Sequence, residues 1–270
     1  MAKGEKAAET GKPDGRGVQS IEVGARLLNA LVNDSGPMML RDLARLADIA
    51  PAQAHPYLVS YRKLGLVRQE EDTGRYQLAP FALTLGITRM RTTDPFRLAS
   101  DAVIELSKDT GLNVALVVWG TFGPTVVMVQ EIGNQLNMKT RPGTVYSLTG
   151  TASGRVFAAF LPEAVAKETM RIERKNNPDS DRVGKARPLT KTETKSIRDA
   201  GYAVIDDPPV PGINAISAPV FDYSGQVQYA VTLIGHESML KMTPDSEYIP
   251  VLLEATQNLS LQLGYVRPTE

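Results

Sequence analysis

Three short segments near the start of the chain each carry apolar residues at helical spacing, and this pattern restricts the fold most. In the first segment the side expected to face inward is Ile21, Gly24, Ala25, Leu28, Leu31 and Val32. In the second segment it is Leu40, Leu43, Ala44 and Ala47, and in the third it is Ala54, Leu58 and Tyr61. These intervals match one face of an α-helix. We therefore expect three short helices between residues 20 and 64.

Two strand-like segments follow the third helix directly. The helix is expected to end at 64–65, because glycine favours the position just after a helix. Residues 66–69 and 75–78 then flank a turn at 72–74, which indicates a hairpin. Three helices and a hairpin within about 60 residues are the layout of a winged helix-turn-helix domain.

The pattern changes near residue 94, where we expect a domain boundary. Asp94 suits the position that caps a helix, and Pro95 suits the first helical position. The predicted organisation is a disordered tail over 1–17, the winged helix-turn-helix over 18–79, a linker helix over 80–94 and a second domain over 95–266.

The second domain mixes hairpin strands with helices. The expected strands are 114–119, 125–132, 202–205, 213–220 and 226–234. The expected helices are 96–108, 151–161, 163–175, 190–200 and 246–263. This alternation favours an antiparallel sheet flanked by helices, so the fold class is α+β.

Composition excludes several classes of protein. The chain has no cysteine, which excludes disulfides, thiolate zinc sites and a cysteine nucleophile. No apolar run reaches the roughly 20 residues of a membrane helix, and the first residues do not resemble a signal peptide. No Gly-x-Ser-x-Gly, His-Glu-x-x-His or P-loop motif occurs, and His236 is expected in a loop without a supporting nucleophile. We expect a cytoplasmic protein with no catalytic residues, metal or cofactor.

Charge alone does not indicate a nucleic-acid binder. The chain has 30 basic and 30 acidic side chains, and residues 18–92 hold nine basic against seven acidic ones. DNA-binding domains usually show a clear basic excess.

Several short motifs nevertheless occur in a fixed order between residues 18 and 264. They are 20–31 (SIEVGARLLNAL), 63–67 (KLGLV), 74–78 (GRYQL), 141–143 (RPG), 151–155 (TASGR), 157–162 (FAAFLP), 197–202 (IRDAGY) and 217–222 (SAPVFD). Together they resemble the IclR-type transcriptional regulators. The resemblance implies a GAF-like effector-binding domain over 95–266, a homodimer or homotetramer, and binding of double-stranded promoter DNA under the control of a small molecule.

A winged helix places its third helix in the major groove, and phosphates are held from nearby elements. Gln53, Pro56, Ser60 and Lys63 share the face opposite the apolar one, where Gln53 would read adenine. Solvated surface is the alternative for the arginines, and packing or a helix-surface role for Tyr57 and His55. The candidate DNA contacts are Arg41, Arg45, Gln53, His55, Pro56, Tyr57, Ser60, Arg62, Lys63, Arg68 and Arg75.

Pro56 departs from the family pattern, which commonly has a basic residue at this position. Proline inside a helix removes a hydrogen bond and clashes with the preceding turn. Either the helix is kinked, or it begins near Pro56 after a separate turn at 51–54. Together with the acidic residues at 70–72, this loss should weaken phosphate attraction. A small-molecule sensing module with weakened or lost DNA binding is therefore the alternative function.

The segment 149–154 precedes and opens an apolar helix, whose free N–H groups would suit a carboxylate. A capped, closely packed helix start is the alternative, and core packing is the alternative for Trp119, Met128 and Tyr146. The resemblance implies that ligands lie against this segment and against the strands around 214–215 and 232–234. The candidate effector contacts are Trp119, Met128, Tyr146, Ala152, Ser153, Gly154, Asn214, Ala215, Thr232 and Ile234.

The expected effector is an aromatic or longer aliphatic acid. Family members that bind small polar acids tend to have thiol or hydroxyl groups at the positions of Ala215 and Ile234. These two side chains are apolar here. An unrecognised hydrolase using His236 is the least supported alternative.

Overall fold

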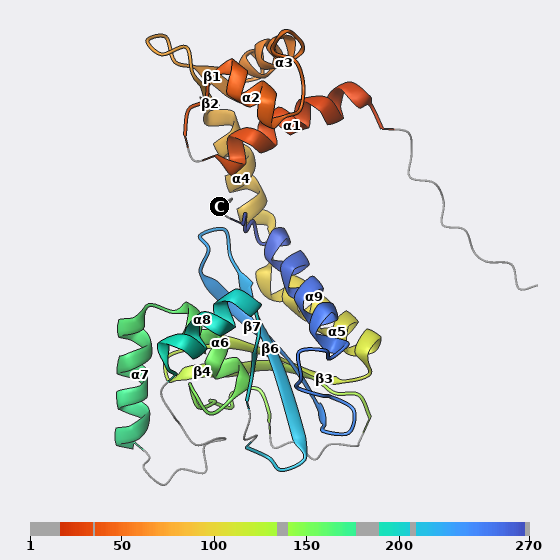
Figure 1. Cartoon of the computed structure of the whole chain (residues 1–270), viewed down its shortest axis with the longest axis vertical. Coiled ribbons are helices and arrows are strands. Elements are labelled where there is room, and N and C mark those ends of the chain that lie inside the picture. The colour runs from red at the N-terminus through yellow and green to blue at the C-terminus, as the bar shows by residue number, and fades with distance from the viewer. Residues whose placement is uncertain (1–16, 35, 134–139, 177–188, 206–208, 268–270) are drawn as a thin grey trace, which may run out of the picture. The chain divides into compact units, whose positions relative to one another are not determined.

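The structure is a computed structural model that describes residues 17–34, 36–133, 140–176, 189–205 and 209–267 (Figure 1). The expected tail over 1–17 lies almost wholly outside the described residues. The chain divides into two compact units between Thr93 and Asp94.

The first unit is a winged helix-turn-helix. Its elements are α1 (Gln19–Asn33), α2 (Leu40–Leu46), α3 (Pro51–Lys63), β1 (Val67–Gln69), β2 (Tyr76–Leu78) and α4 (Pro80–Thr92). The two short strands pair antiparallel, with Arg68 opposite Gln77. Their hairpin closes over a core that includes Leu27, Leu43, Ala54, Leu58 and Val67.

Helix α1 is rotated from the expected orientation. Ile21 and Val32 are 69% and 48% exposed, whereas Val23 and Leu27 are buried. Gly24, which was expected to face inward, is buried, and a Cβ added there would lie 2.1 Å from the Tyr61 hydroxyl of α3. A side chain at position 24 would therefore require the Tyr61 ring to move.

Helix α3 is continuous through Pro56. It begins at Pro51, which occupies the first helical position, and ends at Lys63. A helix start near Pro56 was therefore a wrong expectation. Proline at the first position needs no hydrogen-bond donor, so Pro51 favours the earlier start.

The second unit is an α+β domain built on one antiparallel sheet. Its helices are α5 (Pro95–Thr110), α6 (Ala152–Phe160), α7 (Glu163–Asn176), α8 (Lys191–Ala200) and α9 (Tyr248–Gln262). Its strands are β3 (Asn113–Gly120), β4 (Gly123–Gln130), β5 (Ala203–Val204), β6 (Ile213–Phe221) and β7 (Val227–His236). The five strands lie in the order β4-β3-β7-β6-β5. The predicted fold class is confirmed, but His236 ends β7 instead of lying in a loop.

Helices cover both faces of this sheet (Figure 1). Helices α5 and α9 pack on the face that carries Leu116, Val231 and Leu233. Helix α6 packs on the other face, against Val117 and Ala230. Asp94 caps α5 by accepting a hydrogen bond from the Arg97 N–H at 3.0 Å. No helix among the described residues has the length and apolar character needed to cross a membrane.

Helix α6 begins in close contact with the loop before it. The Thr151 hydroxyl caps the helix by accepting a hydrogen bond from the Gly154 N–H at 3.0 Å. A Cβ added at Gly154 would lie 2.2 Å from the Ser147 carbonyl oxygen and 2.5 Å from that of Leu148. Glycine at 154 is therefore required by packing, because both neighbours are backbone atoms.

We expect Gly154→Ala to lower the free energy of unfolding by about 1–3 kcal/mol, the usual cost of overpacking a core. The sign of this change in the free energy of unfolding is informative, because a glycine-to-alanine change at an open helix position raises it by about 1 kcal/mol. Gly86→Ala in α4 is the control, measured at protein concentrations where the chain is monomeric, because within one chain nothing lies within 4 Å of a Cβ there. Urea unfolding of both variants measures the difference, and equal stabilisation of the two would contradict the packing argument.

Candidate functional site

The exposed face of α3 carries the polar row expected from its spacing. Gln53, Pro56, Ser60 and Lys63 are exposed, while Ala54 and Leu58 on the opposite face are fully buried. His55 is exposed beside this row. The Ser60 hydroxyl donates to the Pro56 carbonyl at 3.0 Å, so it is partly engaged within the helix.

Cationic side chains lie on the elements around α3. Arg41 and Arg45 are exposed on α2, and Arg68 is exposed on β1. Arg62 donates to the Gln69 side-chain oxygen at 3.2 Å, and Arg75 donates to the Pro37 carbonyl at 3.3 Å. All five side chains are accessible to a phosphate, and two of them are oriented by weak contacts to neighbouring segments.

Tyr57 does not belong to the exposed row. It is half-buried and packs against the core of the first unit. Burial raises the pKa of the neighbouring Tyr61, with a smaller contribution from Tyr57. The core alternative therefore fits Tyr57 better than a phosphate contact, because its ring follows the buried side of α3.

The tip of the wing is acidic. Glu70 accepts hydrogen bonds from Gln77 at 2.8 Å and from the Thr73 hydroxyl at 2.7 Å, which hold its carboxylate within the hairpin. Glu71 and Asp72 are exposed next to it. Their negative charge opposes the phosphate attraction of Arg68 and Arg75.

Three buried hydroxyl groups meet where α6 begins on the sheet. Thr232 of β7 shares hydrogen bonds with Ser153 of α6 at 2.8 Å and with Ser217 of β6 at 2.9 Å. Each of the three residues is at most 2% exposed. We call Ser153, Ser217 and Thr232 the hydroxyl cluster. Ser217 was missed from the sequence, although it shares a strand face with Ala215, two residues earlier.

An apolar pair lies beside the hydroxyl cluster. Ala215 of β6 is directly opposite Ile234 of β7 in the register, as Ser217 is opposite Thr232. Both apolar residues belong to the core on the α6 side of the sheet. Ala152, Ser153 and Gly154 of the first turn of α6 are buried against this core. Six of the ten predicted effector residues thus lie around one region.

The loop before α6 is held by buried polar groups. Glu173 is buried, with 8% of the residue exposed. Its carboxylate accepts a hydrogen bond from the Leu148 N–H at 3.2 Å. Arg155 donates to the carbonyls of Thr149 at 3.2 Å and Val204 at 3.1 Å. The Thr149 hydroxyl is buried, and no hydrogen-bond partner for it lies among the described residues. A buried hydroxyl without a partner can donate to an entering polar group.

Two predicted effector residues face the wrong side of the sheet. Met128 is opposite Leu116 in the register and packs with the layer of α5 and α9. The Asn214 amide donates to the Leu240 carbonyl at 2.8 Å, and Leu240 belongs to the same layer. Neither side chain can contact a ligand beside α6. A bulge in the pairing of β3 with β4 interrupts the alternation of side chains and turns Met128 toward this layer.

Trp119 and Tyr146 lie on the sheet face covered by α6, at the end away from the hydroxyl cluster. Trp119 is four residues beyond Ala115, which is opposite Thr232, so it is about 13 Å farther along the strand. Its ring centroid is 5.6 Å from that of Phe157. Burial raises the pKa of Tyr146, and the hydrogen bond that its hydroxyl donates to Thr140 at 3.1 Å opposes this shift. These contacts fit core packing.

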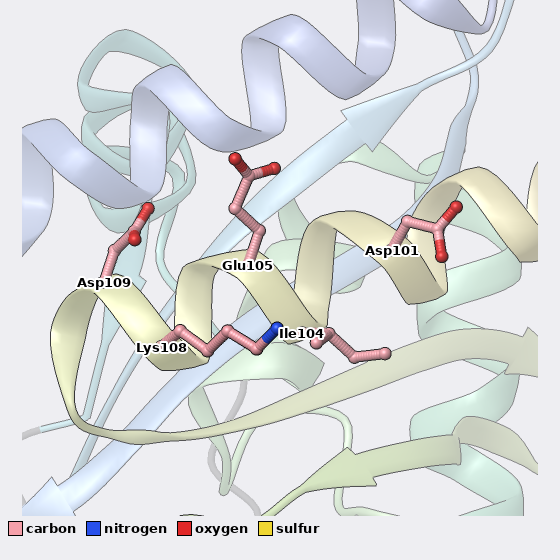
Figure 2. Close-up of a pocket in the computed structure, with 5 residues that line it drawn as sticks. All are labelled: Asp101, Ile104, Glu105, Lys108 and Asp109. Atoms are coloured by element: carbon pink, nitrogen blue, oxygen red, sulfur yellow. The ribbon is translucent and has the colours of Figure 1, made fainter. Parts of the chain in front are cut away.

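A surface hollow of about 480 Å³ lies elsewhere, along α5 (Figure 2). It is lined by Asp101, Ile104, Glu105, Lys108 and Asp109. The three carboxylates point to the same side of the helix in Figure 2. Among the described residues no group of three His, Asp or Glu side chains is arranged to hold a metal ion.

Comparison with known proteins identifies both units. Residues 20–71 match the family model described as the IclR helix-turn-helix domain, and residues 89–261 match the one described as the C-terminal domain of bacterial IclR transcriptional regulators. The chain belongs to the IclR family. It is therefore a transcriptional regulator of that family and not an enzyme, with a DNA-binding helix-turn-helix domain and a ligand-binding C-terminal domain.

Individual IclR-family proteins resemble the chain over nearly its whole length. The probable regulator ArcR of Halobacterium salinarum is 25% identical over 260 residues, which cover 94% of this chain and 95% of that protein. The transcriptional repressor IclR of Escherichia coli is 21% identical over 268 residues, which cover 98% and 97%. The crystal structure of HmgR from Pseudomonas aeruginosa is 31% identical, covers 92% of this chain and 99% of that one, and has a TM-score of 0.75.

We expect Thr232→Val to lower the free energy of unfolding by about 1–3 kcal/mol, because Ser153 and Ser217 would each lose the hydroxyl that they contact. Thr88→Val, at an exposed position of α4, is the control and should change stability little. Thermal unfolding compares the two variants. Equal stability of Thr232→Val and the unchanged chain would show that the cluster contributes no net stabilisation.

Proposed function

We propose that the chain binds double-stranded promoter DNA as a cytoplasmic homodimer or homotetramer and that a small organic acid controls this binding. The exposed row of α3, flanked by the arginines of α2 and of the wing, carries the DNA half of the proposal. The N-terminal residues of a recognition helix contact base edges, and the surrounding cationic side chains hold phosphates.

Pairing of two chains is needed for useful affinity. Each phosphate contact adds affinity through counterion release, and one reader domain here offers few cations against an acidic wing tip. Pro56 also occupies the position where family members commonly have a basic residue. A single domain should therefore bind modestly and in a salt-sensitive manner, whereas two domains on paired half-sites gain from effective concentration.

Helix α4 supports self-association. None of its residues is buried within the first unit. Its exposed apolar side chains are Phe81 at 45%, Leu83 at 65%, Leu85 at 50%, Ile87 at 46% and Met90 at 50%. Leu83, Ile87 and Met90 are spaced as one helix face, which is the pattern of a helix that packs on a partner. A second copy of the chain is the proposed partner.

We expect Leu83→Glu to reduce the affinity for a duplex with two half-sites by about 100-fold and to leave the affinity for one half-site unchanged. The charge would be buried against the partner helix and would disfavour pairing. Thr88→Glu, on the opposite side of α4, is the matched control. Sedimentation and duplex binding measure the effect, and unaltered affinity of Leu83→Glu for the paired site would exclude α4 as the contact.

The effector half of the proposal rests on the region around the hydroxyl cluster. The N–H groups of Ala152 and Ser153 at the start of α6 suit a carboxylate, whereas that of Gly154 is taken by the Thr151 cap. The hydroxyl cluster and Thr149 would offer further hydrogen bonds. Ala215 and Ile234 form an apolar wall beside them. A ligand with one acidic end and an apolar body matches this combination, so we propose an aromatic or longer aliphatic acid.

We expect Ala215→Ser and Ile234→Ser to shift binding from benzoate or octanoate toward lactate. Each change adds a hydroxyl, and Ile234→Ser also removes apolar contact, of which each methylene-sized part changes affinity about four-fold. Calorimetric titration of the unchanged chain and of both variants with the three acids measures the shift. Preference of the unchanged chain for lactate would contradict the proposed ligand class.

The second candidate function is a small-molecule sensing module with weakened or lost DNA binding. Pro56 within α3 and the acidic wing tip favour it, since both reduce phosphate attraction. The two functions differ in selection from a library of random duplexes. A DNA-binding regulator enriches a defined sequence, whereas a sensing module binds its acid but enriches none.

A further inference from the structure

Pro56 stands at the centre of the surface that would face DNA. It is the sixth residue of α3 and is exposed, so its ring is not part of the core. The helix continues through it, although proline is the least favourable residue in a helix interior. Because the ring takes no part in core packing, it is free to contact a bound molecule.

The surroundings of Pro56 are apolar. Ala52 and Val59 are four residues before it and three after it, so they lie on the same side of α3. Ala52 is exposed and Val59 is half-buried. The nearby Ser60 hydroxyl donates to the Pro56 carbonyl at 3.0 Å, which draws it toward the helix backbone. The middle of the row is thus apolar, with the amide of Gln53 before it and the charge of Lys63 after it.

Pro56 also changes the backbone of α3. In a regular α-helix the Ala52 carbonyl accepts a hydrogen bond from the N–H of residue 56. Proline has no N–H and its ring displaces that carbonyl, so Ala52 loses its regular donor. Ala52 is exposed as a residue, so its carbonyl can accept a hydrogen bond from a donor outside the helix.

An apolar ring beside a carbonyl acceptor matches one kind of base pair. In the major groove a T·A pair presents the thymine 5-methyl group and the adenine N6 amino donor. When a C·G pair replaces it, the methyl group is absent, and the guanine O6 acceptor stands where the adenine amino donor was, facing the Ala52 carbonyl unfavourably. We propose that Pro56 is a specificity-determining residue that selects a T·A pair, through apolar contact with the methyl group and through the Ala52 carbonyl that it frees. This inference rests on the proposed DNA binding.

The test begins with selection of bound duplexes from a random library by the full-length chain. If no sequence is enriched, the proposed DNA binding fails, and this inference fails with it. If a sequence is enriched, every thymine in a half-site is replaced in turn by deoxyuridine, which lacks only the methyl group. Its partner adenine is separately replaced by unsubstituted purine, which lacks only the amino group.

We expect one position in each half-site at which loss of the methyl group weakens binding about four-fold, the value of one buried methylene. Loss of the amino group at the same pair should weaken binding about five-fold, the value of one hydrogen bond. Pro56→Ala should abolish both effects, because alanine removes the ring and supplies an N–H for Ala52. This variant should fold well, since alanine is the better helix former.

Lys63→Ala is the matched control on the same face of α3. It should weaken binding to all duplexes alike through loss of a phosphate contact, and it should keep both base effects. An enriched sequence without a methyl-dependent position overturns the inference and leaves the proposed function intact. So does a methyl effect that persists in Pro56→Ala, because another residue would then read the thymine.

Discussion

The approach of α6 to its preceding loop is the contact on which the second domain depends. A Cβ at Gly154 would lie 2.2 Å from the Ser147 carbonyl oxygen, so only glycine allows the helix to start so close to the loop. This approach brings Ser153 to within 2.8 Å of Thr232 on β7, and Thr232 in turn contacts Ser217 on β6. The loop is held from both sides by Glu173 and Arg155. Packing of one small residue thus places the first turn of α6 against two strands.

In the first domain, packing likewise positions one helix, α3, but it fixes only one side of that helix. Its recognition helix is held by the buried side, through Ala54 and Leu58, and the opposite side is left free to vary. Pro56 lies on that free side, where an unfavourable residue weakens the helix without opening the core. The fold therefore tolerates at position 56 a residue that a buried position would reject.

Regular patterns could be predicted from the sequence, whereas contacts between distant segments could not. The helical spacing around Leu43 and Ala54, the capping pair Asp94-Pro95 and the antiparallel sheet followed from local rules. The rotation of α1 did not, because the burial of Leu27 depends on packing against residues of the later helices. Met128 packs on the opposite face because a bulge interrupts the alternation of its strand, and Ser217 was overlooked although its partner Thr232 was predicted. The position of the candidate site residues relative to one another thus required the sheet register.

The register of β6 with β7 also determines how this site can evolve. Ala215 faces Ile234 and Ser217 faces Thr232, so four side chains of alternating residues form one small square on the sheet. A point substitution at any corner alters the chemistry of the square and leaves the hydrogen-bonded ladder in place. A single-residue insertion within either strand would instead turn the square toward α5 and α9, because side chains alternate between faces. New ligand preferences in such a domain are therefore reached through substitutions, and length changes are confined to the turn at 222–226.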